Sequence, residues 1–366
     1  MNFKLRILAS LLAALALARA GDPDFKPGLE GKRLIEYGWD APNTAYLREH
    51  VREMEKRPFQ GVVLRVTRTT EPRLGGTEET LGWRVFGRER FQPADYEHAI
   101  EDLRATPFRA FTDNFVQVIS MPGLDWFDPE WSAVAFNAGV LARVAKQGGC
   151  VGLMFDPEQY GGLEFWSYGA LPEARRKQVS LEQAASKVRE RGGEFMRAVN
   201  GEFPNIKILC LFGPAMTPGN AAYDLLAPFY EGMCRAAAEG TEIIDGYEQA
   251  YAFSKEADFQ EGRKRMGKTR DLFEDKGCFD RVMRAGFGLW LDHNSGRRGG
   301  WFPGQPEKNQ FTPETWRSAV HYGLSQSDRY VWIYSERLNW WDGSVVGPDY
   351  EDAQRDARRE RGGDRH

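Results

Sequence analysis

Short apolar runs, rich in β-branched and aromatic side chains, alternate along this chain with longer segments whose apolar residues recur at helical spacing. Runs of the first kind are typical of buried strands, and segments of the second kind are typical of amphipathic helices. Strands are predicted over residues 33–39, 61–67, 111–120, 150–155, 206–212, 242–247, 285–291 and 330–335. Helices are predicted over residues 45–56, 93–104, 129–146, 181–200, 221–238, 255–275 and 313–324.

The order of these elements predicts the fold. Eight strands separated by helices indicate a parallel sheet, and the near-regular spacing favours closure into a single (β/α)8 TIM barrel over an open, doubly wound sheet. No Pro/Gly/Ser-rich linker or internal repeat marks a second domain, so we expect one α/β domain over residues 21–348. Residues 349–366 are dense in Asp, Arg and Glu, and we expect them to be disordered.

The N-terminus has the composition of a secretory signal peptide. Lys4 and Arg6 precede an apolar run over residues 7–17, and Ala18 and Ala20 form an A-x-A cleavage pattern. The run is shorter than a typical transmembrane helix, and every later apolar run is broken by charge or Gly within about ten residues. We therefore expect cleavage after Ala20 and a secreted or periplasmic protein that does not stay in the membrane.

Charge and cysteine spacing argue against two kinds of binding site. The formal net charge of −4 provides no strong positive field, so nucleic acid is not an expected partner. Cys150, Cys210, Cys234 and Cys278 are widely spaced and include no C-x-x-C pair, which argues against a zinc site. We interpret them as core thiols, with disulfides in an exported chain as the alternative. The oligomeric state is not predicted.

Acidic and aromatic residues gather at the ends of the predicted strands, where the loops of a β/α barrel form the active face. The candidate catalytic carboxyl groups are Glu158, Asp156, Asp292, Glu248 and Glu336. The candidate substrate contacts are Glu36, Trp39, Asn114, Tyr160, Tyr251, Trp290, His293 and Trp332. Glycoside hydrolysis needs a proton donor and a second carboxylate, and aromatic faces pack against sugar rings. The combination predicts a carbohydrate substrate and no cofactor.

The pair Asp156 and Glu158 ends the fourth predicted strand. Because one residue separates them, an extended strand would direct both side chains into the barrel mouth. Two adjacent carboxylates repel, which raises one pKa and leaves an acid that keeps its proton near neutral pH. We expect Glu158 to be the general acid and Asp156 to orient it. A metal site formed with Asp292 and His293 is the alternative.

Residues 149–158, GCVGLMFDPE, resemble the fourth-strand signature D-x-x-D-x-D-x-E of chitinase-type barrel glycosidases, of which the final D-x-E is present. The resemblance implies that Glu158 is the acid, that Asp156 steadies an N-acetyl group of the substrate, and that Tyr251 assists. The chain is also similar to barrel glycosidases that place the acid after strand four and the nucleophile after strand seven. That resemblance implies Glu158 and Asp292 as the pair.

Residues 262–269 satisfy the phosphate-loop expression G-x-x-x-x-G-K-T. A phosphate loop connects a buried strand to a helix, whereas these residues lie inside a charged run that is predicted to be one helix. We interpret their basic side chains as a solvated helix face.

Taken as a whole, the patterns predict an exported glycoside hydrolase that cleaves an oligo- or polysaccharide by carboxylate acid/base chemistry. The alternative is a catalytically silent barrel that binds glycans or another exported partner, because a fold alone does not imply activity.

Overall fold

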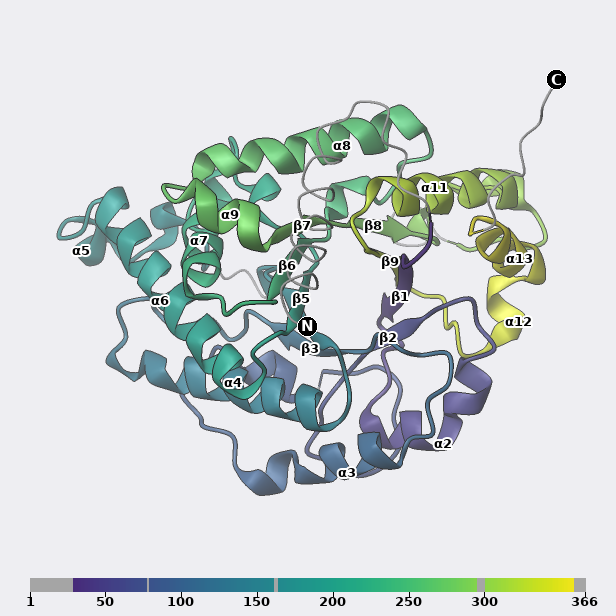
Figure 1. Cartoon of the computed structure of the whole chain (residues 1–366), viewed down its shortest axis with the longest axis horizontal. Helices are drawn as coiled ribbons and strands as arrows, with labels where there is room; N and C mark the ends of the chain where they lie inside the picture. Colours follow the sequence, from purple (N-terminus) through teal and green to yellow (C-terminus); the bar gives the residue numbers. More distant parts are fainter. Residues whose placement is uncertain (1–28, 78, 161–163, 295–299, 359–366) are drawn as a thin grey trace, which may run out of the picture.

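A barrel of parallel strands forms the centre of the molecule (Figure 1). The computed structural model describes residues 29–77, 79–160, 164–294 and 300–358. Every predicted strand is present, although most are shorter than the apolar run that predicts them. The strands are β1 Arg33–Gly38, β2 Gly61–Leu64, β3 Phe115–Ile119, β4 Gly152–Asp156, β5 Lys207–Cys210, β6 Glu242–Asp245, β7 Met283–Ala285, β8 Phe287–Trp290 and β9 Tyr330–Ser335.

The sheet closes through the segment that contains β7 and β8. The strand order is β7-β6-β5-β4-β3-β2-β1-β9-β8, and all neighbouring strands are parallel. β7 pairs with β6 and β8 pairs with β9, and only Gly286 separates β7 from β8. A Cβ atom at Gly286 would lie 2.8 Å from Ile244 Cγ2. The close packing between β7 and β8 therefore requires glycine at this position. One run of chain therefore contributes the seventh strand and closes the predicted (β/α)8 barrel.

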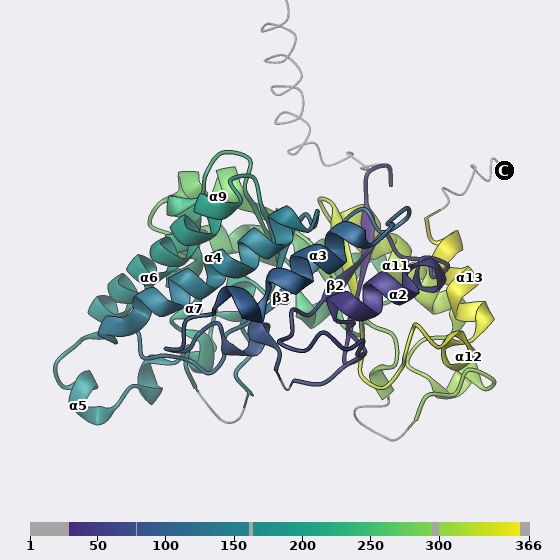
Figure 2. The same ribbon diagram turned by 90° about the horizontal axis from the view of Figure 1, so that it is seen from below.

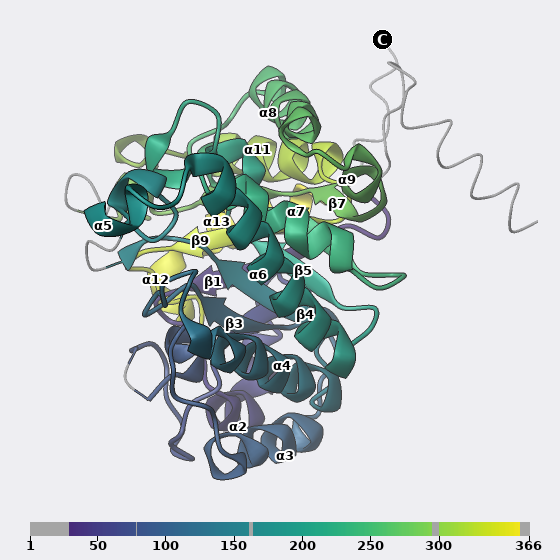
Figure 3. The ribbon, with the colours of Figure 1, turned by 90° about the vertical axis from the view of Figure 1, so that its left-hand side faces the viewer.

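The helices form a ring around the barrel (Figures 1 and 3). All the predicted helices are present, and the phosphate-loop-like residues 262–269 lie in α8 and the 3₁₀ turn after it. The helices of the ring are α2 Thr44–Met54, α3 Glu97–Ala105, α4 Ser132–Gln147, α6 Leu181–Glu202, α7 Leu226–Ala236, α8 Glu256–Lys268, α9 Lys276–Val282, α11 Pro313–Gln326 and α13 Pro348–Asp356. Two short helices, α5 Glu173–Arg176 and α12 Gly343–Val346, lie in loops that follow strand C-termini, at the lower left and the lower right of Figure 2.

Side-chain caps begin several of the helices. Asn43 Oδ1 accepts from the backbone N of Tyr46 at 3.0 Å. Ser180 and Gln183 form a capping box at α6, and Thr312 precedes Pro313 at α11 in a second one. Because these caps satisfy backbone N–H groups locally, the helix starts are readable from sequence alone.

The expectation that the chain is disordered from residue 349 is wrong for residues 349–358. These residues contain most of α13, which packs against α11 and completes the ring of helices after β9. Tyr350 is fully buried and donates its hydroxyl to Phe311 O at 2.7 Å. Gln354 Nε2 donates to Pro58 O at 3.2 Å, which connects α13 to the segment after α2. Residues 359–366 lie outside the described part of the chain.

Truncation tests this assignment of α13. A chain that stops after Gly347 is expected to lose about 3 kcal/mol or more of unfolding free energy, because the buried Tyr350 and Gln354 are removed and the partners of both are left unpaired. A chain that stops after Arg358 keeps these contacts and is expected to unfold at the wild-type urea concentration. Equal urea midpoints for the two truncations would show that α13 is dispensable.

The predicted signal peptide lies outside the described residues, so export and its cleavage site stay predictions. Within the described ranges, no helix is long and apolar enough to cross a membrane.

Candidate active site

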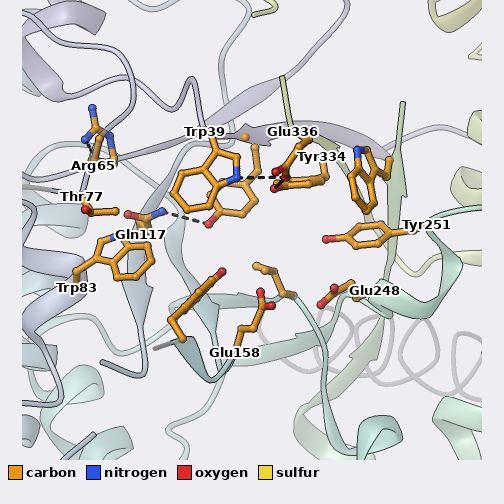
Figure 4. Close-up of a pocket in the computed structure, with 16 residues that line it drawn as sticks. Trp39, Arg65, Thr77, Trp83, Gln117, Glu158, Glu248, Tyr251, Tyr334 and Glu336 are labelled. Carbon is orange, nitrogen blue, oxygen red and sulfur yellow. Dashed lines mark hydrogen bonds between the residues drawn. The ribbon is translucent and has the colours of Figure 1, made fainter. Parts of the chain in front are cut away.

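A cavity of about 180 Å³ opens at the C-terminal ends of the strands (Figure 4). The lining contains seven of the sequence-predicted site residues, which come from loops on opposite sides of the barrel. They are Trp39, Glu158, Tyr160, Glu248, Tyr251, Trp290 and Glu336. The cavity thus combines three carboxyl groups with an aromatic wall, as the sequence predicts for a sugar site.

Asp156 supports the cavity from beneath without lining it. This last residue of β4 is fully buried, and its two carboxylate oxygens accept from Glu158 N and from the Tyr160 hydroxyl, each at 2.8 Å. Burial raises the pKa of Asp156 to about 7, and the charge of Glu158 adds to the rise. The expectation that both carboxyl groups face the mouth therefore holds for Glu158 alone, which Asp156 helps to position.

Glu248 reaches the cavity from a tight turn after β6. The preceding Tyr247 has φ 40° and ψ 64°, in the left-handed region that bulky residues rarely adopt, and Asp245 Oδ1 holds this turn by accepting from Tyr247 N at 3.0 Å. Burial raises the pKa of Glu248 to about 8, and the charges of Glu158 and Asp156 add to the rise. Glu248 therefore keeps its proton at neutral pH.

Glu336 lies on the opposite wall from Glu158 and Glu248 (Figure 4). Its Oε2 accepts from Trp39 Nε1 at 3.3 Å and from the Tyr334 hydroxyl. These two donors fix the carboxylate against an aromatic surface and leave Oε1 available to a ligand hydroxyl.

Aromatic rings line both sides of the cavity. On one side, the rings of Trp39 and Trp83 stack at 29° with centroids 6.4 Å apart, and Tyr160 packs 4.8 Å from Trp83. On the other side, the rings of Tyr251 and Tyr334 stack at 23° with centroids 5.7 Å apart. Flat rings of this kind suit the C–H faces of sugars.

Asp292 does not line the cavity, contrary to its prediction as a catalytic carboxylate. It is 1% exposed and anchors the loop that follows β9. Its oxygens accept from Trp290 Nε1 at 2.8 Å and from the backbone N atoms of Glu336, Arg337 and Leu338 at 2.9, 2.8 and 3.2 Å. Because Asp292 accepts these four hydrogen bonds, it holds Trp290 and Glu336 in position and does not reach a substrate.

The Asp292→Ala variant is expected to lose about 3 kcal/mol of unfolding free energy, because four donors lose a buried charged acceptor. Asp292→Asn is the matched control. It keeps one acceptor oxygen, so its loss in urea unfolding is expected to be smaller. Wild-type stability of the alanine variant would contradict the anchoring role.

Glu36 and Asn114 also lie outside the cavity. Glu36 is fully buried on β1 beside Asp40, and its neighbour Tyr37 lines the cavity in its place. Asn114 precedes β3 at the other end of the barrel, where its Oδ1 accepts from Val62 N at 3.2 Å. The two errors have different origins. Alternation along β1 sends Glu36 and Tyr37 to opposite faces, whereas Asn114 lies before β3, which begins later than predicted.

Trp332 and His293 lie behind residues of the lining. Trp332 is 1% exposed and donates Nε1 to Gly246 O at 2.9 Å, so its ring forms the layer beneath Tyr251. The ring of His293 packs 4.8 Å from that of Trp290 and supports it. Neither residue lines the cavity.

The remaining lining residues were not among the predicted site residues. They are Tyr37, Gly38, Arg65, Gly76, Thr77, Trp83, Gln117, Leu211 and Tyr334. Residues two positions apart in a strand lie on the same face. This rule could have predicted Tyr37 as a lining residue next to Trp39, and Tyr334 next to Glu336. Nothing in the sequence pattern signals Trp83, which belongs to a long loop after β2 that no predicted element covers.

The alternative hypothesis of a metal site requires the side chains of Asp156 and Glu158 to lie close to those of Asp292 and His293. Asp292 is occupied by the loop after β9, and His293 packs on Trp290. Across the part of the chain that the structure describes, no group of three or more His, Cys, Asp or Glu residues could hold a metal ion.

Comparisons with known proteins assign no family. No family model and no curated protein matches the chain. Among solved structures, the chain is similar to a GH18 chitinase from Pseudoalteromonas aurantia (11% identity, TM-score 0.45, covering 89% of this chain and 99% of that one). It is also similar to a glucosidase from Croceicoccus marinus (12%, 0.46, covering 93% and 69%) and to Aspergillus clavatus Sph3 in complex with GalNAc (12%, 0.37, covering 91% and 100%). Similarities this distant transfer no activity, substrate or site residue to this chain.

Proposed function

We propose that this protein is a glycoside hydrolase and that Glu158 and Glu248 are its catalytic pair. The observation that carries the proposal is the placement of both carboxyl groups in one aromatic-walled cavity at the active face of a barrel, where burial and the charge of Glu158 raise the pKa of Glu248. One of the pair keeps a proton at neutral pH because of burial and the charge of the other. A protonated carboxyl group beside a second carboxyl group is the arrangement that an acid and its partner need.

In the proposed mechanism Glu248 donates its proton to the glycosidic oxygen as the bond to the leaving sugar breaks. Glu158 is the second carboxylate, and it stabilises the positive charge that develops at the anomeric carbon. A water molecule adds to this carbon, and the proton that it releases restores the acid form of Glu248. Asp156 holds Glu158 through the backbone N and holds Tyr160 through the hydroxyl. The sequence alone favours Glu158 as the acid, and the raised pKa of Glu248 is the reason for exchanging the two roles.

Glu336 and the aromatic walls are proposed to bind the sugar. The stacked Trp39 and Trp83 on one side and Tyr251 and Tyr334 on the other provide platforms on both sides of the carboxyl pair. A chain of sugars could therefore lie across the cavity with the scissile bond above Glu158 and Glu248. If the predicted signal peptide is cleaved after Ala20, the substrate is an extracytoplasmic glycan.

The test is a screen of the mature chain, from Gly21, against a panel of polysaccharides, with new reducing ends as the readout. Glu158→Gln is run beside the wild type and is expected to lower hydrolysis of the preferred substrate by about 10³-fold. Binding without hydrolysis by the wild type would favour a silent glycan-binding barrel. Equal activity of the variant would remove Glu158 from the catalytic pair.

A further inference from the structure

Two buried thiols meet between helices α7 and α9, and neither lines the cavity. Cys234 in α7 is 0% exposed and Cys278 in α9 is 4% exposed. Their side chains are hydrogen bonded to each other. Cys278 Sγ donates to Asp275 O at 3.0 Å, so Cys234 supplies the hydrogen between the two sulfur atoms.

The backbone on both sides of this thiol pair is held in place. Arg281, one turn beyond Cys278, donates Nη2 to the carbonyl of Cys234 and Nη1 to that of Ala237, each at 2.8 Å. At the start of α9, Asp275 N donates to Glu231 Oε1 of α7 at 2.9 Å. α7 and α9 therefore pack side by side with fixed register, as Figures 1 and 3 show. A disulfide requires such a close and fixed approach of two backbones.

The two thiols differ in reactivity. The hydrogen bond from Cys234 lowers the pKa of Cys278, and the positive charge of Arg235 lowers it further. By contrast, burial raises the pKa of Cys150 to about 12 and raises that of Cys210. Because the thiolate is the nucleophile in thiol–disulfide exchange, Cys278 is the cysteine best suited to react first.

We propose that Cys234 and Cys278 form a structural disulfide that ties α9 to α7. In the reaction, Cys278 thiolate attacks one sulfur of a low-molecular-weight disulfide and expels a thiolate. Cys234 then gives up its proton, attacks Cys278 Sγ and expels the second thiolate, and the protons of the two protein thiols pass to the two expelled thiolates. The two protein thiols are oxidised to one disulfide while the small disulfide is reduced to two thiols, so atoms and electrons balance. The predicted export of the chain would deliver it to a compartment where such oxidants prevail.

The position of this bond gives it a structural role. α9 ends at Val282, and β7 begins at the next residue, Met283. β7 belongs to the segment that joins β6 to β9 and so closes the barrel. The disulfide would fix the helix that leads into this closing segment, and it would constrain the unfolded chain over the loop between the two cysteines.

Refolding in a redox buffer tests the proposal. The reduced mature chain is unfolded in urea and refolded with reduced and oxidised glutathione, and native protein is identified by circular dichroism. Alkylation after denaturation is expected to count two free thiols instead of the four in the sequence. The mass is expected to fall by about 2 Da, proteolysis to yield one peptide that links Cys234 to Cys278, and the thermal midpoint to rise by about 3 °C or more.

Single variants separate the pair from the other cysteines. Cys278→Ser is expected to keep its three thiols after refolding in the same buffer, while Cys150→Ser is expected to lose two of its three. Native wild-type protein with four alkylated thiols would overturn the proposal. A disulfide-linked peptide that contains Cys150 or Cys210 would overturn it too. Cys210 is the more important of these two alternatives, because its charge also affects the pKa of Cys234.

Discussion

The Glu248→Gln variant is expected to hydrolyse its glycan about 10³-fold more slowly than the wild type, because the leaving oxygen loses its proton donor. The wild-type rate is expected to fall as the pH rises through about 8, where Glu248 gives up its proton. This alkaline limb is expected to disappear in the variant. An aryl glycoside whose leaving group needs no proton should recover most of the lost rate. Steady-state kinetics between pH 5 and 10 measure all three effects.

Glu336→Gln is the matched control, because it removes another cavity carboxylate by the same isosteric change. Its amide still meets Trp39 and Tyr334, so the expected result is weaker substrate binding with the alkaline limb intact. An alkaline limb that persists in Glu248→Gln, with no recovery on the aryl glycoside, would assign the acid to another residue.

The second large effect concerns Glu36 and Asp40, two buried carboxyl groups outside the cavity. Glu36 is 0% exposed, and its side chain is hydrogen bonded to that of the neighbouring Asp40. Burial raises the pKa of Glu36 well above its usual value, and the neighbouring Asp40 adds to the rise. Burial also raises the pKa of Asp40, to about 6. We infer that the pair shares a proton in the folded protein.

This pair makes stability depend on pH. Both folded pKa values exceed the unfolded ones, so the folded state binds more protons and its stability falls with rising pH. The loss begins above the unfolded values of 3.8 for Asp40 and 4.5 for Glu36, and it continues through about pH 6 and beyond. In the Glu36→Gln variant, the side-chain amide can still donate a hydrogen bond to Asp40, and it does not ionise as the buried carboxyl group of Glu36 does. The variant is expected to gain about 2 kcal/mol of unfolding free energy at pH 8 and to show a shallower decline from pH 5 to 8.

Urea unfolding at intervals of pH measures this effect, and Glu314→Gln serves as the control because Glu314 is exposed on α11. The control is expected to follow the wild-type curve. A Glu36→Gln curve parallel to wild type would mean that Glu36 does not titrate differently in the folded and unfolded states.

The barrel was readable from sequence because parallel strands are buried on both faces. Each strand is then a nearly continuous apolar run, such as 206–212 around β5, and each helix shows an apolar stripe between such runs. The last helix of the ring was missed because α13 is mostly charged. Only Tyr350, Ala353 and Ala357 supply apolar surface, at a helical spacing that the surrounding Asp, Glu and Arg conceal.

By itself, the sequence determined the alternation of elements and the edge of the barrel where the chemistry lies, because the C-terminal ends of parallel strands share one face. It placed Glu158, Glu248 and Glu336 at that face and favoured Glu158 as the acid. Only the tertiary structure decided which acidic groups reach the cavity and which anchor a loop, as Asp292 does. Side-chain direction and desolvation depend on neighbours distant in sequence, and those neighbours are what set the pKa of Glu248.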